Sequence, residues 1–98
     1  LIVQRYLPGC AGITPHRDHV RYGFLIAIIL LTGDGYFGIC DDRQGNESRE
    51  IDFKPGDLLL MGGPGLIPNF RRPFHFVNGV TDCRRTIGLR YDTHKSDA

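Results

Sequence analysis

The chain has 98 residues, of which 41% are hydrophobic and 23% charged, and its formal net charge is +1. This length allows one small domain, and this composition excludes a disordered or fibrous chain. The longest apolar run, Phe24–Leu31, has eight residues, whereas a membrane-spanning helix needs roughly twenty. No membrane partner is therefore expected.

The pattern of apolar residues predicts short strands rather than helices. Glycine accounts for 13 residues, about double its usual share, and long helices tolerate that content poorly. No helical period is found, and the apolar runs are separated by turns that contain Gly or Pro. We predict eight strands, in chain order Leu1–Tyr6, Ile13–Arg17, Phe24–Leu31, Tyr36–Cys40, Glu50–Phe53, Asp57–Met61, Phe74–Val77 and Thr86–Tyr91.

Eight short strands in so small a chain favour an all-β core, a closed double sheet of the jelly-roll or cupin-like type, also called a double-stranded β-helix. The run FLIAIILL does not alternate, so we expect both faces of that strand to be covered. Residues 1–91 would form the core and residues 92–98 a polar C-terminal tail. The chain begins with Leu inside a predicted strand, and we expect a fragment of a longer α+β protein.

Three cysteines, Cys10, Cys40 and Cys83, lie far apart and form no Cys-x-x-Cys pair. This usage argues against a disulfide framework or a zinc ribbon and favours a reducing setting. A cytoplasmic location is expected, or a nuclear one if the source is eukaryotic. We interpret all three cysteines as small buried hydrophobes.

Charge is unevenly distributed along the chain. Residues 34–57 carry a net charge of −4 and residues 66–91 a net charge of +4, and ten of the twelve basic residues are arginine. Arginine suits bidentate contacts with carboxylates and phosphates. Arg71, Arg72 and Arg85 could therefore meet the phosphates of DNA or RNA, although such a cluster is more often a solvated face.

A candidate metal site comes from two histidines and one aspartate. His16 and Asp18 are two residues apart, so on a strand their side chains project from one face, and His75 lies on a later predicted strand. Two histidines and one carboxylate on neighbouring strands form the facial triad that binds Fe(II) and leaves positions open for a cosubstrate and O₂. By themselves a His-x-Asp motif and a single histidine are weak signals.

The arginines of the last strand add an independent signal. A 2-oxo acid bound at the open iron positions needs a fixed cation for its remote carboxylate. Arg84 and Arg90 are six residues apart, an even spacing that places them on one strand face. Arg85, of opposite parity, is expected on the solvated outer face.

Taken together, His16, Asp18, His75, Arg84 and Arg90 resemble the HxD…H…RxxxxxR pattern of the Fe(II)/2-oxoglutarate-dependent dioxygenases, specifically their AlkB-like branch. Three flanking stretches are similar to that branch as well. They are Gln4–Gly9 before the HxD motif, Gly56–Gly63 in the Gly-Asp strand, and Asp82–Arg90 in the closing strand. The likeness extends over essentially the whole chain, in order.

The resemblance implies a role for each matched residue. His16, Asp18 and His75 would be the iron ligands and form the catalytic centre. Arg84 would bind the far carboxylate of 2-oxoglutarate, and Arg90 would hold it near its metal-chelating end. Tyr6 and Gln4 would hydrogen-bond the same cosubstrate.

The implied activity is oxidative hydroxylation or demethylation, with a modified nucleobase in DNA or RNA as the first choice of substrate. Two departures bear on that choice: Val20 stands where the DNA-repair members carry a second acid, and Gln4 replaces their usual Asn. A hydroxylase of a small molecule or peptide side chain is the alternative within enzymes. A non-catalytic cupin-like binding module is the alternative outside them, and no zinc-hydrolase motif is found.

Overall fold

The computed structural model describes residues 1–19, 21–66 and 71–90, which form eight β-strands and no helix. The predicted all-β class and the predicted number of strands are thus confirmed. With no helix in the described part of the chain, nothing there could cross a membrane as a long apolar helix. The strands are β1 (Ile2–Tyr6), β2 (Ile13–His16), β3 (Leu25–Thr32), β4 (Tyr36–Cys40), β5 (Arg49–Glu50), β6 (Leu58–Gly62), β7 (Phe74–Asn78) and β8 (Arg84–Arg90).

Most predicted boundaries agree with the observed strands to within two residues, and β5 differs most. It pairs with β4 only through Arg49 and Glu50, whereas the prediction placed it at Glu50–Phe53. After Glu50 the Ile51 N–H still donates to the carbonyl of Phe37 on β4 at 2.9 Å, and the side chains of Ile51 and Phe53 then pack against the apolar core. Val20, the predicted strand end at Tyr91 and the predicted tail lie outside the described residues.

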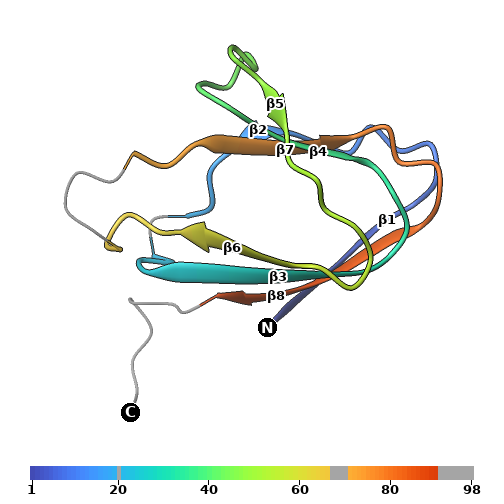
Figure 1. The fold of residues 1–98 in the computed structure, drawn as a ribbon, viewed down its shortest axis with the longest axis horizontal. Helices are drawn as coiled ribbons and strands as arrows, with labels where there is room; N and C mark the ends of the chain where they lie inside the picture. Colours follow the sequence, from blue (N-terminus) through green and yellow to red (C-terminus); the bar gives the residue numbers. More distant parts are fainter. Residues whose placement is uncertain (20, 67–70, 91–98) are drawn as a thin grey trace.

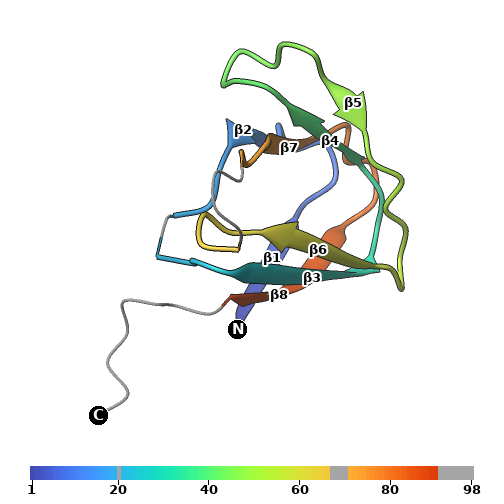
Figure 2. The same ribbon diagram turned by 60° about the vertical axis from the view of Figure 1, so that its left-hand side comes forward.

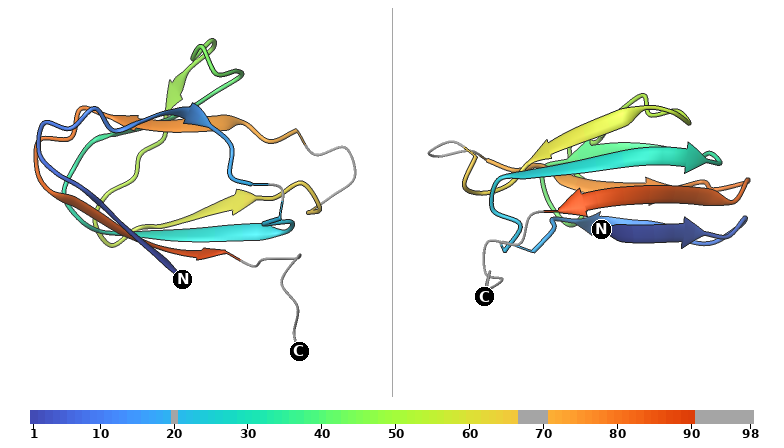
Figure 3. Two further views of the ribbon diagram at one scale, coloured as in Figure 1. Left: turned by 180° about the vertical axis from the view of Figure 1, so that it is seen from behind. Right: turned by 90° about the horizontal axis from the view of Figure 1, so that it is seen from below.

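The strands form two antiparallel four-stranded sheets that face each other. The first sheet has the order β1-β8-β3-β6 and the second β2-β7-β4-β5. Figures 1 and 2 show them as two layers, and the right-hand view of Figure 3 shows the strands of the first sheet side by side. Successive strands change sheet at every connection except the one between β4 and β5.

The apolar core lies between the two layers. Strand β3 contributes Ile26, Ile28 and Leu30, and Leu30 is completely buried. From the second sheet and the turn after β7, Phe37 and Val80 meet this layer. Only one of the three cysteines, Cys40, is buried as predicted; Cys10 and Cys83 are half-buried, and all three thiols are free.

The predicted two-sided burial of the FLIAIILL run is wrong for the described part of the chain. Burial along β3 alternates, because only its inner face meets the second sheet. The outer face of the first sheet carries a row of apolar side chains in register across all four strands, namely Val3, Ile87, Ile29 and Leu58. Val3 and Leu58 are 66% and 58% exposed.

The turn into β2 depends on a close backbone approach at Gly12. This residue has a φ of +78°, and a Cβ at this position would lie 2.0 Å from the carbonyl oxygen of Val77. Only glycine combines that conformation with that contact. Gly12 thereby allows β2 to start against β7 with Ile13 opposite Val77, and a register shift within β2 then places His16 directly opposite His75.

Candidate metal centre

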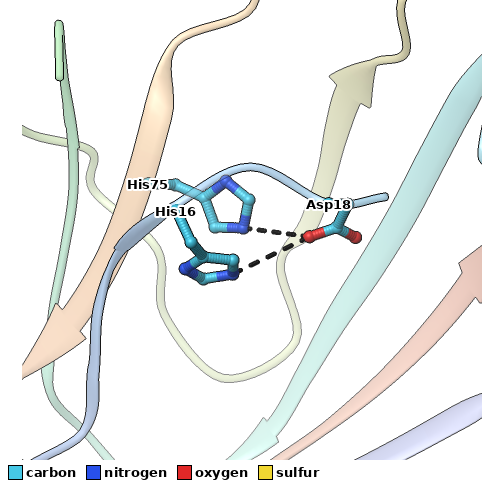
Figure 4. A group of neighbouring side chains, drawn as sticks. All are labelled: His16, Asp18 and His75. Atoms are coloured by element: carbon cyan, nitrogen blue, oxygen red, sulfur yellow. Dashed lines mark ion pairs between the residues drawn. The ribbon is translucent and has the colours of Figure 1, made fainter. Parts of the chain in front are cut away.

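Three side chains with metal-binding atoms meet between the two sheets. His16 is the last residue of β2, His75 is its register partner on β7, and Asp18 follows two residues after the end of β2. Their ligand atoms all lie within 4.8 Å of one another. Figure 4 shows both imidazole rings directed at the Asp18 carboxylate, with Oδ1 of Asp18 3.8 Å from Nε2 of His16 and 3.4 Å from Nε2 of His75.

The imidazole of His16 is oriented by the chain that precedes it. Its Nδ1–H donates to the carbonyl of Thr14 at 2.9 Å, which leaves the Nε2 lone pair facing Asp18. Burial lowers the pKa of His16 below its usual value, and the nearby His75 adds to that effect. A neutral imidazole with a fixed tautomer is the form that binds a metal ion.

Asp18 is held as a carboxylate. Burial by itself raises its pKa, but hydrogen bonds from His75 and Arg90 outweigh burial and hold the pKa of Asp18 well below its usual range. Arg90 donates from Nε to Oδ2 of Asp18 at 2.7 Å. The second oxygen of Asp18 is therefore anchored, while Oδ1 faces the two histidines.

The backbone of Asp18 is anchored as well. Arg72 donates from Nη1 to the Asp18 carbonyl at 2.9 Å, and Arg17 donates from Nε to the Arg72 carbonyl at 3.0 Å. These bonds tie the loop after β2 to the segment before β7. The three candidate ligands thus sit on a supported frame, as a metal site requires.

A cavity of about 50 Å³, which we call the arginine cavity, adjoins the three ligands. By volume it has room for about four waters. Polar side chains from β1 and β8 line it together with the ligands, namely Gln4, Tyr6, Arg84, Thr86 and Arg90. Gln4 is the register partner of Thr86, and Tyr6 that of Arg84.

Arg84 and Arg90 bring positive charge to this cavity. Arg84 is 1% exposed and donates from Nη1 to the carbonyl of Asp34 at 2.9 Å. Nε of Arg84 and Nη1 of Arg90 are buried without a hydrogen-bond partner among the described residues. Buried charged donors without partners are costly, and an anion in this cavity could accept hydrogen bonds from them.

Tyr6 supplies a neutral hydrogen-bond donor to the arginine cavity. Burial raises the pKa of the Tyr6 phenol, and the charge of Arg84 offsets only part of that effect. The phenol consequently keeps its proton near neutral pH and can donate to an anionic oxygen.

A second cavity, of about 250 Å³, shares Asp18, His75 and Phe37 with the first. We call it the apolar cavity, because Ile39, Ile51, Leu59, Met61 and Pro73 supply much of its lining. The polar side chains in its lining are Arg17, Asp18, Arg72 and His75. Two of the candidate metal ligands, Asp18 and His75, therefore line both the arginine cavity and the apolar cavity.

All seven site residues expected from the sequence line one or both cavities. The structure does not bring together Arg71, Arg72 and Arg85. Arg85 is exposed on the outer face of the first sheet, as predicted, and is the second residue of β8. Figure 1 shows that β8 and β7 begin at opposite ends of the sandwich. Arg72 instead turns inward to Asp18.

Sequence reasoning missed Thr86, Gly88, Arg17 and Asp34. Thr86 and Gly88 share the parity of Arg84, so strand alternation could have found them. The contacts of Arg17 and Asp34 join segments far apart in the chain, and no sequence signal predicts them.

A comparison with protein-family models finds no match to this chain, and a comparison with curated proteins finds none either.

Proposed function

We propose that this chain is the catalytic core of an Fe(II)/2-oxoglutarate-dependent dioxygenase, an oxidoreductase of the AlkB-like type. The observation that carries the proposal is the pair of unpartnered guanidinium donors, Nε of Arg84 and Nη1 of Arg90, in a cavity lined by His16, Asp18 and His75. A buried anion that also chelates a metal ion would pair with the two guanidinium groups and would complete the coordination of a metal held by the three ligands.

The order of strands supports a double-stranded β-helix. In that fold the chain passes back and forth between two facing sheets, so that neighbours in sequence lie in different layers. The orders β1-β8-β3-β6 and β2-β7-β4-β5 have this property. The metal ligands then project into the space between the layers from the second sheet and the loop after β2.

The donor set suits Fe(II). Two imidazoles and one carboxylate occupy one face of a six-coordinate ion and leave the opposite positions open. Bound Fe(II), with 2-oxoglutarate and O₂, would supply the oxidising chemistry that places a hydroxyl group on a substrate C–H bond. On an N-methyl group the resulting hemiaminal releases formaldehyde, so the same chemistry demethylates.

The chain's own residues would bind and orient the cosubstrate. Arg84, which Asp34 holds through its carbonyl, would take the remote carboxylate of 2-oxoglutarate. The Tyr6 phenol would donate a hydrogen bond to 2-oxoglutarate, and the Gln4 amide would contact it from the same strand face. Arg90 would act on both partners, because its Nε holds Asp18 while its Nη1 stays available to the cosubstrate.

The substrate proposed first is a modified nucleobase in DNA or RNA, following the resemblance. Formaldehyde release from alkylated oligonucleotides would support it, and affinity should fall with log[salt] at a slope of about −0.9 for each phosphate contacted. A flat salt response would count against a nucleic-acid partner. One observation favours the second candidate, hydroxylation of a small molecule: the lining of the apolar cavity has no amide or hydroxyl side chain among the described residues to read a base edge.

The test is an anaerobic titration of the protein with Fe(II) and then with 2-oxoglutarate, following the visible charge-transfer band of the chelate. The band should require both components and should disappear in His16→Ala. His19→Ala is the matched control, because this exposed histidine lies outside the cluster. If the folded protein gives no band, and if His16→Ala binds 2-oxoglutarate as tightly as the wild type does, the result would instead support a non-catalytic binding module.

A further inference from the structure

Two arginines that the proposed reaction does not use line the apolar cavity. Arg17 follows β2 directly and Arg72 precedes β7 by two residues, and both are half-buried. The guanidinium of Arg17 lies 4.2 Å from the centre of the Phe74 ring. The bonds from Arg17 to the Arg72 carbonyl and from Arg72 to the Asp18 carbonyl fix both side chains beside the candidate metal ligands.

The positive charge of this pair is not neutralised by the described part of the chain. Neither guanidinium forms an ion pair with a carboxylate there, and the nearest anionic site residue, Asp18, gives its oxygens to Arg90 and the histidines. Burial lowers the pKa of Arg72 and the charge of Arg17 lowers it further, and the Asp18 carboxylate offsets only part of this effect. Each guanidinium has five N–H donors, and most of those on Arg17 and Arg72 have no partner among the described residues.

Apart from Asp18 and His75, the remaining lining of the apolar cavity is apolar. A cavity of this kind binds an apolar body through burial of its surface, while a few polar groups fix its orientation. Two guanidinium groups among otherwise mostly apolar walls define an amphipathic ligand. Because Arg72 bonds to the Asp18 carbonyl, the anionic head would be held beside the candidate metal ligands, and the apolar body would lie along the apolar walls.

We infer that the substrate is a small molecule with an apolar body and an anionic head, a carboxylate or a phosphate, which Arg17 and Arg72 bind. This inference rests on the proposed function for the reaction, but the binding itself requires neither metal nor cosubstrate. Arg17 and Arg72 are then the residues that select the substrate and set which of its C–H bonds faces the metal.

The test is calorimetric titration of the metal-free protein with hexyl phosphate and with hexanoate, using 1-hexanol and inorganic phosphate as the two halves of the probe. We expect at least one amphipathic anion to bind more tightly than either half. Arg17→Gln should weaken that binding by at least about tenfold, because charge-assisted hydrogen bonds are lost. Arg17→Lys keeps the positive charge but not the planar guanidinium, so its affinity for the anion should lie between that of the wild type and that of Arg17→Gln.

Three controls locate the binding. Arg5→Gln, on the exposed outer face of β1, should leave the affinity unchanged. Arg84→Met should also leave it unchanged, since Arg84 lines only the other cavity. His16→Ala should abolish the charge-transfer band but retain the probe, so failure of the dioxygenase proposal is seen separately from failure of this one.

Three outcomes would overturn the inference. In the first, 1-hexanol binds as tightly as the anions. In the second, Arg84→Met removes anion binding and Arg17→Gln does not. In the third, an unmodified oligothymidylate competes more strongly than both anions, and its binding depends on Arg17. The last outcome would assign the two arginines to a nucleic-acid backbone instead.

Discussion

Gly88 determines whether Arg90 can reach Asp18. It lies on the inner face of β8, two residues before Arg90, and a Cβ at this position would lie 2.1 Å from Nη1 and 3.1 Å from Cζ of Arg90. The guanidinium therefore occupies the space that any side chain at this position would need. In Gly88→Ala the end of the flexible Arg90 side chain must move, and its bond to Oδ2 of Asp18 breaks.

The cost falls on the site and, to a reduced extent, on folding. A charge-assisted hydrogen bond contributes about 1.5–3 kcal/mol, so its loss should raise the pKa of Asp18 toward its usual value. Loss of a group that orients a metal ligand typically costs about 10–100-fold in metal affinity. Replacing Gly by Ala within a strand otherwise favours folding by roughly 0.5–1 kcal/mol, which partly offsets the broken bond.

The assay is anaerobic Fe(II) titration alongside urea unfolding of the metal-free protein. We expect metal affinity to fall by about tenfold or more, and the free energy of unfolding of the metal-free protein to fall by about 0.5–2.5 kcal/mol, the difference between the lost bond and the strand propensity gained. In an Arg90→Met background, Gly88→Ala should have no further effect on metal affinity, since the two changes remove the same contact. Wild-type metal affinity in Gly88→Ala, or equal losses in both backgrounds, would refute the reasoning.

Three further predictions test the frame around the site. The Asp34 carboxylate accepts hydrogen bonds from the backbone of the β7–β8 turn, while the Asp34 carbonyl accepts one from Arg84. Asp34→Ala should therefore weaken 2-oxoglutarate binding roughly tenfold and leave Fe(II) affinity unchanged. Asp34→Asn should retain most of the 2-oxoglutarate affinity, and equal losses for 2-oxoglutarate and Fe(II) would contradict a positioning role. Because the folded protein holds the pKa of Asp18 below its unfolded value of about 3.9, the unfolded chain binds more protons, and stability of the metal-free protein should fall as pH drops below about 4. Urea titrations should show that the free energy of unfolding declines less with falling pH in Asp18→Asn than in the wild type. An identical decline would contradict the role given to Asp18. Leu30→Ala should cost about 2–5 kcal/mol of unfolding free energy because Leu30 is fully buried, against a change within about 0.5 kcal/mol for the exposed Leu58→Ala; similar losses by calorimetry would place the core elsewhere.

Which residues of β1 and β8 share a strand face was predictable from the sequence. Side chains on a strand alternate between two faces whatever the fold, so Gln4 and Tyr6 share one face and Arg84 and Arg90 share another. The structure directs both faces into the arginine cavity. The positions of the strands were equally readable, because Gly and Pro mark the turns between short apolar runs.

Coverage of the sheets was not readable in the same way. An unbroken apolar run such as FLIAIILL has the same composition whether one or both faces of the strand are covered. In the described part of the chain, Leu25 and Leu31 of this run are exposed. Only the position of the second sheet decided which face became the core.

The sequence by itself determined the fold class, the strands and the residue types able to bind a metal ion and an anion, because these depend on local geometry and chemistry. The tertiary structure alone decided which of them meet. The β2–β7 pairing sets His16 opposite His75, and Arg90 reaches Asp18 across 72 residues of chain. Such contacts depend on how two sheets pack on a shared core, a long-range property that no local pattern encodes.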